Sequence, residues 1–178
     1  MADPTTILSI LAVDKGVTGK MLGWIQDFLS NRKGFSVVQG ERSDTFPLFN
    51  GTPQGAVLSP YLFNILIDKL LRVLEDSLGP EITKNLTIVS YADDLMMASN
   101  HSAAPMILEK ALSHLESAST ALGLQISTSK TKAMAWNHSH FLPKFDFHIY
   151  KGKVEWVREF KYLLYLMTTS LSSLMLII

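Results

Sequence analysis

Two adjacent aspartates, Asp93 and Asp94, are the residues of this sequence best suited to do chemistry. They lie between two apolar runs, residues 86–89 (LTIV) and 95–98 (LMMA), whose composition favours β-strands. Neighbours in a regular strand point to opposite faces, so these carboxylates can share a task only at a sharp bend, such as a tight hairpin. Two carboxylates this close repel each other unless a cation lies between them, and oxygen ligands of this kind suit Mg²⁺. The pattern predicts a β-hairpin with a magnesium-binding tip, and an ordinary solvated Asp-Asp turn is the alternative.

A second stretch with functional potential is the loop at residues 50–58 (NGTPQGAVL). Its two glycines, one on each side of Pro53 and Gln54, allow the backbone to approach a ligand closely. The Gln54 amide offers both a donor and an acceptor, which suit a base edge or a sugar. The Ser-Pro pair at 59–60 then predicts the start of a helix. A plain strand-to-helix connection is the alternative for this loop.

The elements that must position these residues alternate between helices and short strands. Apolar residues recur at helical spacing in three segments, and alternating apolar runs between turn residues predict strands. The helix from residue 59 is expected to pack its apolar stripe, which includes Leu62, Phe63, Leu66 and Leu70, on the sheet that carries the hairpin. The expected helices cover residues 19–29, 59–75 and 105–122, the expected hairpin covers about residues 86–99, and the other expected strands cover 35–39, 45–49, 124–126, 133–136, 145–150 and 154–157.

Composition limits the class of protein. The 178 residues are 47% hydrophobic and 18% charged, which indicates a globular domain with a sizeable core or a part of a larger one. Sixteen basic and sixteen acidic residues cancel, whereas a free-standing nucleic-acid binder normally has a basic excess. The sequence has no cysteine, which excludes disulfides and zinc–thiolate sites. The apolar C-terminal residues are fewer than the ~20 of a membrane-spanning helix, so no membrane anchor is expected.

Four motifs, in order, resemble the reverse transcriptases of non-LTR (LINE-type) retrotransposons. Residues 51–64 (GTPQGAVLSPYLFN) resemble the second palm motif, and residues 91–94 (YADD) resemble the catalytic hairpin. Residues 123–132 (GLQISTSKTK) are similar to the motif that follows, and residues 160–163 (FKYL) to the start of the primer grip. The likeness covers about residues 14–163, and its spacing fits this branch better than a group II intron-type or telomerase-like relative.

The resemblance implies an RNA-directed DNA polymerase that adds dNTPs to a DNA primer on an RNA template. The reaction of the family is an in-line phosphoryl displacement assisted by two metal ions. Asp93 and Asp94 would be the catalytic residues and would bind Mg²⁺, for which Mn²⁺ can substitute. The residues expected to bind nucleotide or template are Pro53, Gln54, Gly55, Tyr91 and Lys130, and those expected to form the primer grip are Phe160, Lys161, Tyr162 and Leu163. Lys130 would approach the phosphates of the nucleotide, and the family works inside the cell, in the nucleus or cytoplasm.

The resemblance also implies the fold, which is α+β. The expected architecture is a reverse-transcriptase palm, an antiparallel sheet with the catalytic hairpin and with helices packed on one face. We expect a helical segment over residues 1–33, the palm core over 34–163 and a divergent apolar tail over 164–178. The fingers and thumb are expected to be largely missing.

One departure from the family bears on activity. The first catalytic motif of the family carries another metal-binding aspartate upstream of the helix that begins near residue 19. Asp3 stands where a second, less central aspartate of that motif would be, so it is not expected to be this ligand. We therefore expect the chain to be inactive by itself. The alternative is a decayed copy or a non-catalytic module with a palm fold that at most binds nucleic acid.

Overall fold

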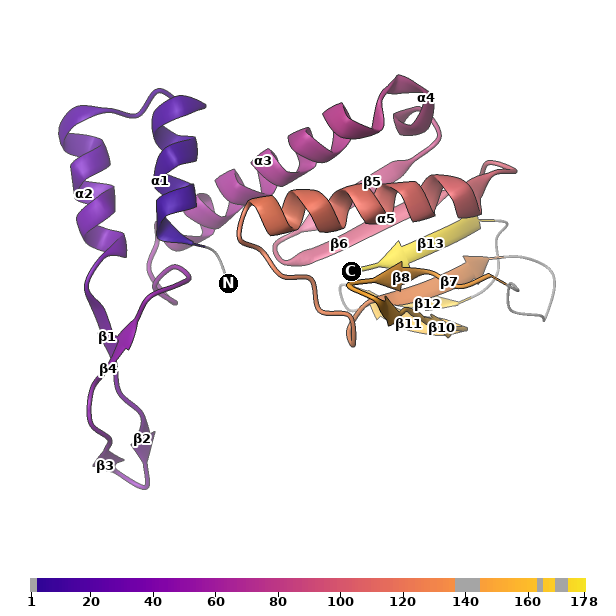
Figure 1. The fold of residues 1–178 in the computed structure, drawn as a ribbon. Coiled ribbons are helices and arrows are strands. Elements are labelled where there is room, and N and C mark those ends of the chain that lie inside the picture. The colour runs from indigo at the N-terminus through magenta and orange to yellow at the C-terminus, as the bar shows by residue number, and fades with distance from the viewer. Residues whose placement is uncertain (1–2, 137–144, 163–164, 169–172) are drawn as a thin grey trace. The chain divides into compact units, whose positions relative to one another are not determined.

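The structure is a computed structural model that describes residues 3–136, 145–162, 165–168 and 173–178 (Figure 1). The chain forms two units, which mix helices and strands as expected for the α+β class. The first unit contains Met1–Leu70 and Ala121–Leu124, and the second contains Leu71–Thr120 and Gln125–Ile178.

The first unit is built around three helices. These are α1 (Pro4–Val13), α2 (Gly19–Leu29) and the first part of α3 (Ser59–Leu78). Asp3 caps α1, because its Oδ2 accepts a hydrogen bond of 3.1 Å from the Thr6 backbone N–H. The three helices share a buried cluster of aliphatic residues, namely Ile7, Ile10, Leu11, Ile25, Leu29, Leu62 and Leu66.

The packing of α3 corrects the sequence prediction. Leu62 and Leu66 were expected to lie on the sheet of the hairpin, but they pack with the residues of α1 and α2. Two ion pairs reinforce this contact, from Lys15 Nζ to Asp68 Oδ2 and from Lys69 Nζ to Asp14 Oδ2, both at 2.8 Å. Helical periodicity identifies the apolar face of a helix, but the partner of that face is decided by tertiary structure.

Two short antiparallel strand pairs extend from the first unit and form a hairpin arm over residues 32–48. At its base β1 (Arg32–Gly34) pairs with β4 (Phe46–Leu48), and near its tip β2 (Val37–Val38) pairs with β3 (Glu41–Arg42). The residues of β2, β3 and β4 are exposed.

The second unit contains a five-stranded sheet within the described residues. Its strand order is β10-β7-β13-β6-β5, and every neighbouring pair is antiparallel except β10 and β7. The strands are β5 (Thr87–Tyr91), β6 (Asp94–Ser99), β7 (Lys132–Trp136), β10 (Glu155–Val157) and β13 (Ser173–Ile177).

Helices and two small hairpins complete the second unit. Helix α5 (Ala104–Ala121) runs along one face of the sheet in Figure 1, and α4 (Pro80–Thr83) follows the end of α3. The hairpins are β8 (His148–Ile149) with β9 (Gly152–Lys153), and β11 (Glu159–Tyr162) with β12 (Tyr165–Thr168). In the part of the chain that the structure describes, no helix is both long and apolar enough to cross a bilayer.

Several stretches differ from the sequence prediction. The strand expected over residues 35–39 is replaced by β1 and β2, and of the strand expected over residues 145–150 only His148–Ile149 is formed. Residues 124–126 were expected to form a strand, but they have no regular structure. Residues 164–178 were expected to form a tail outside the palm core, but residues 173–177 are the central strand of the sheet. The predicted division into residues 1–33, 34–163 and 164–178 does not coincide with the two units. That division remains a prediction.

Candidate functional site

The two aspartates lie at the tip of the β5–β6 hairpin, as predicted. Tyr91 and Asp94 are the last paired residues, so Ala92 and Asp93 alone make the turn. Ala92 has a φ of +51°, the left-handed region that a tight hairpin turn requires. This turn supplies the sharp bend that lets two consecutive carboxylates lie at one end of the hairpin.

Burial along β6 explains why the hairpin forms in this register. Leu95, Met97 and Ser99 are buried, whereas Met96 and Ala98 on the opposite face are half-buried. A shift by one residue would turn Leu95 and Met97 out of the core, so the apolar pattern fixes the register. The register in turn places Asp94 at the first position of β6, on the face of Met96.

The donor set at this tip fits a hard divalent cation. Both carboxylates are exposed, and neither forms an ion pair with any residue that the structure describes. Unpaired carboxylates with open solvent on one side suit Mg²⁺, which binds one or two carboxylates and retains several waters. Within the described ranges no group of three or more His, Cys, Asp or Glu could hold a metal. The tip therefore offers two carboxylates and no more acidic partners among those residues.

The sheet brings Lys130 to the same end as the two aspartates. Strands β6 and β7 both run antiparallel to β13, so they are parallel to each other and start at the same edge. Lys130 lies just before β7 in a turn that is closed by its backbone N–H and that of Thr131, which donate to the Ser127 carbonyl at 3.1 and 3.0 Å. Its side chain is exposed. With one strand between them, β6 and β7 are about 9–10 Å apart, a distance that a nucleotide triphosphate can span.

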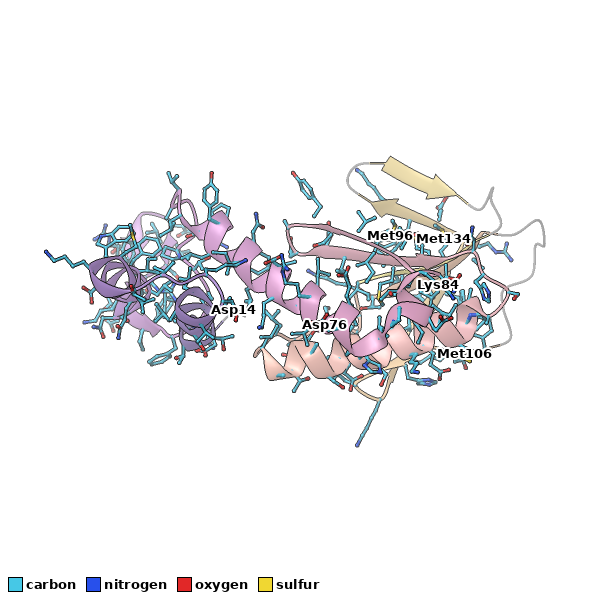
Figure 2. All side chains as sticks on the ribbon, turned by 90° about the horizontal axis from the view of Figure 1, so that it is seen from above. Asp14, Asp76, Lys84, Met96, Met106 and Met134 are labelled. Carbon is cyan, nitrogen blue, oxygen red and sulfur yellow. The ribbon has the colours of Figure 1, made fainter. Side chains whose placement is uncertain are left out.

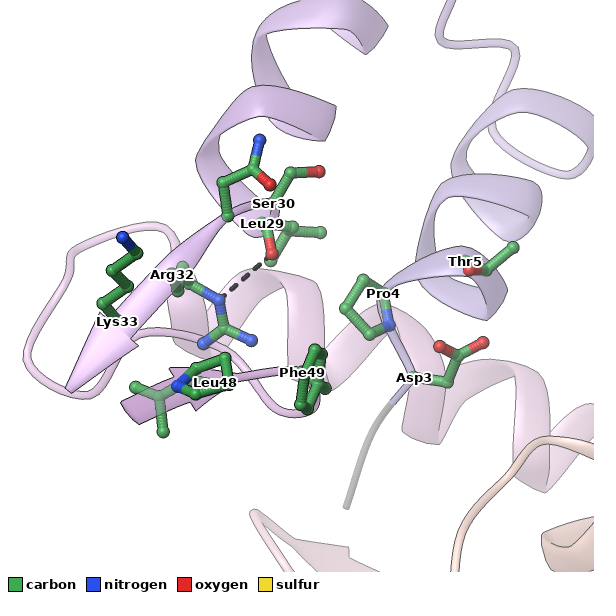
Figure 3. A pocket seen from close by; sticks show the side chains of 11 residues that line it. Asp3, Pro4, Thr5, Leu29, Ser30, Arg32, Lys33, Leu48 and Phe49 are labelled. Carbon is green, nitrogen blue, oxygen red and sulfur yellow. Dashed lines mark hydrogen bonds between the residues drawn. The ribbon is translucent and has the colours of Figure 1, made fainter. Parts of the chain in front are cut away.

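The loop with Gln54 belongs to the first unit, where hydrogen bonds hold its two ends. The Arg32 guanidinium donates to the carbonyls of Asn50 at 3.0 Å and Gly51 at 2.7 Å. Its Nε donates to the Leu29 carbonyl at 3.1 Å, the hydrogen bond drawn in Figure 3. At the other end, the Ser59 hydroxyl donates to the Pro53 carbonyl at 2.5 Å.

Between these two anchors the loop presents its tip to solvent. Gln54 and Gly55 are exposed, and Gly55 has a φ of +81°, a conformation that disfavours a side chain. Pro53 is half-buried below them. The anchored frame leaves the Gln54 amide available to a ligand.

The predicted primer-grip residues fall on β11. Phe160 is half-buried and packs against the cluster of Met134, Met175 and Ile177 on the sheet. Lys161 is exposed, and Tyr162 is the last residue of β11, paired with Tyr165. The remaining predicted residue, Leu163, lies outside the described residues.

The reverse transcriptase (RNA-dependent DNA polymerase) family matches residues 12–166 of this chain. The chain belongs to the reverse transcriptase family. Similar proteins include the Pol polyprotein of the type-2 retrotransposable element R2DM of Drosophila melanogaster, which is 33% identical over 93 residues, or 51% of this chain. A Pol polyprotein of the type-1 element R2 of Popillia japonica is 35% identical over 88 residues, or 48% of the chain. A 115 kDa protein of the type-1 element R1DM of D. melanogaster is 29% identical over 117 residues, or 64% of the chain.

These relatives are proteins of R1 and R2 elements, which agrees with the non-LTR branch that the motif spacing predicts. The matched residues span only 8%, 14% and 10% of the length of these three relatives.

Sequence reasoning missed two contributors to the site. No motif in the sequence singles out Arg32, although it anchors the loop of Gln54. The apolar run at the end of the chain was read as a tail, although it pairs with β6 beside Asp94. A continuous apolar run of this length is typical of a strand buried on both faces, which is the signal that could have found it.

Proposed function

We propose that this chain is the palm of a retrotransposon reverse transcriptase and that Asp93 and Asp94 hold Mg²⁺ where nucleotides are added to a DNA primer. The observation that carries the proposal is the two-residue turn, which brings two exposed and unpaired carboxylates together at the motif that resembles the catalytic hairpin of the family. Family membership over residues 12–166 supports RNA as the template.

Each predicted site residue has its own role in this proposal. Bound magnesium would supply charge stabilisation at the attacking and leaving oxygens of the displacement. Lys130, exposed at the same end of the sheet, would neutralise the phosphates of the incoming nucleotide as a point charge. Tyr91, 64% exposed and paired with Asp94, would contact the primer end. Pro53, Gln54 and Gly55 would bind nucleotide and template, and residues 160–163 would hold the primer.

We further propose that the 178-residue chain binds Mg²⁺ weakly and does not extend a primer by itself. A pair of metal ions about 3.5–4 Å apart needs carboxylates that bridge them. The tip provides two carboxylates, and the described residues offer no third acidic group beside them. The balance of sixteen basic and sixteen acidic residues also supports weak binding of nucleic acid by this chain.

A primer-extension assay tests both parts. The purified chain would be incubated with poly(rA)–oligo(dT), dTTP and Mg²⁺ or Mn²⁺, alone and with the first-motif segment of a related Pol polyprotein fused to its N-terminus. We expect extension only from the fusion, abolished by Asp93→Asn and unchanged by Asp76→Asn, which alters an exposed aspartate of α3 (Figure 2).

Three results would contradict the proposal in different ways. Extension by the unfused chain that is lost in Asp93→Asn would show that two carboxylates suffice. Extension by the fusion that survives Asp93→Asn would show that this turn is not the catalytic site. No extension by a fusion that folds and binds the template–primer would favour a non-catalytic nucleic-acid-binding module.

A further inference from the structure

The sheet of the second unit contains a slot one strand wide between β6 and β7. These two strands are parallel and are joined through α5, and β13 lies between them. Without an occupant, both edges that face this slot would leave backbone N–H and C=O groups unpaired inside the protein, which native structures avoid. The fold therefore requires a strand at this position.

β13 is matched to the slot on both faces. Met175 and Ile177 pack with Met134, Met96 and Phe160 on one face, and Figure 2 shows Met96 and Met134 on the sheet. Leu176, which points to the opposite face, is fully buried. Strands that are buried on both faces are continuous apolar runs, and this strand has that composition.

The occupant comes from outside the part of the chain that defines the family. The family match ends at residue 166, whereas β13 begins at Ser173. Strands β6 and β7 and the helix α5 that joins them lie within the matched residues. The strand between them, β13, lies outside the matched residues.

β13 also contacts the candidate metal site. Leu95, the residue after Asp94, donates its N–H to the Ile178 carbonyl at 3.0 Å and accepts from the Ile178 N–H at 2.8 Å. On its other side Leu95 is opposite Ser90 of β5. The start of β6 is thus fixed from both sides, and on one side by Ile178, the residue that directly follows β13.

We propose that residues 173–177 form a replacement strand, which takes a sheet position that the family-matched residues leave open and positions the Asp93–Asp94 turn. The metal-binding part of this inference rests on the proposed function, and the completion of the sheet does not. β13 acts through Leu95, so it is a positioning element and not a ligand of the cation.

Amide hydrogen exchange in the full chain tests the positioning directly. The amides of a strand alternate between its two neighbours, so those of Leu95 and Met97 face β13, whereas the Met96 amide faces β5. Leu176→Asp places a charge at a position buried on both faces and should expel β13 from the slot. We expect exchange at Leu95 and Met97 to rise at least about tenfold relative to Met96, and Mn²⁺ affinity to fall in parallel.

Rescue and a matched control separate positioning from general destabilisation. A synthetic peptide with the sequence of residues 173–178, added to the Leu176→Asp chain, should restore both amide protection and Mn²⁺ affinity. Leu112→Ala removes a buried leucine of α5 in the same unit and should leave the Met97-to-Met96 exchange ratio and the Mn²⁺ affinity unchanged. If Leu176→Asp does not fold, Leu176→Ala takes its place, with the same expected direction.

Unchanged protection of Leu95 and Met97 in a folded Leu176→Asp chain would overturn the replacement strand. Loss of that protection with unchanged Mn²⁺ affinity would overturn its positioning role. If the unmodified chain binds no Mn²⁺ that Asp93→Asn removes, the proposed function fails, and the exchange measurement still decides whether β13 fills the slot.

Discussion

The turn that joins β5 and β6 contains a residue in an unfavourable conformation, and Ala92→Gly should therefore stabilise the protein. Ala92 has a φ of +51°. The left-handed conformation costs a residue with a Cβ about 1–2 kcal/mol, and glycine adopts it freely. Glycine also loses more backbone entropy on folding, which offsets about 0.5–1 kcal/mol of the gain. The net expectation is a stabilisation of about 0.5–1 kcal/mol, or ~1–4 °C in Tm for a chain of this size.

The matched control is Ala98→Gly, in the regular part of the same hairpin. Ala98 is half-buried in β6 and packs against the cluster of Met134, Met175 and Ile177. Glycine at this position would lose the methyl contact and would raise the entropy of the unfolded chain, and both effects destabilise the fold. We expect a destabilisation of about 1–2 kcal/mol. Urea denaturation followed by circular dichroism measures both variants. If Ala92→Gly destabilises the chain as much as Ala98→Gly does, the turn does not have the strained geometry described here.

Two further predictions concern the surroundings of the site. Arg32→Lys keeps the charge but loses the guanidinium Nη2, which donates to two carbonyls of the loop. We expect a loss of about 1–2 kcal/mol of stability and faster amide exchange over residues 51–56. The control is the exposed neighbour, since Lys33→Gln should change neither. Ile177→Asp places a carboxylate at a buried position of β13, so, like Leu176→Asp, it should displace the strand and lower Mn²⁺ affinity about tenfold, whereas the conservative Ile177→Val should leave Mn²⁺ affinity unchanged. Equal Mn²⁺ affinities of these two folded variants would contradict the role of β13 beside the turn.

The hairpin and its two aspartates could be predicted from the sequence because the signals are local. Alternating apolar residues, a pair of turn-forming aspartates and the register that burial imposes all lie within thirteen residues, 87–99. The helix bounds were predictable for the same reason, since α3 ends before Gly79 and Pro80, and Gly123, with a φ of +69°, follows the end of α5.

Features that depend on distant partners were not predictable from local patterns. The periodicity of α3 identifies Leu62 and Leu66 as inward residues, but not that α1 and α2 receive them. The apolar run at 174–178 is compatible with a tail, a strand or a helix end, and its place between β6 and β7 depends on the slot that those strands leave. The role of Arg32 likewise depends on carbonyls eighteen and nineteen residues away.

The most direct test of the account is a Mn²⁺ titration of the 178-residue chain, followed by electron paramagnetic resonance with Mg²⁺ as competitor. The account predicts one weak site that Mg²⁺ displaces, that Asp93→Asn and Asp94→Asn each abolish, and that Asp76→Asn leaves unchanged. Mn²⁺ binding of the same strength in Asp93→Asn, Asp94→Asn and the unmodified chain would show that the hairpin tip is an ordinary solvated turn and would contradict the central claim.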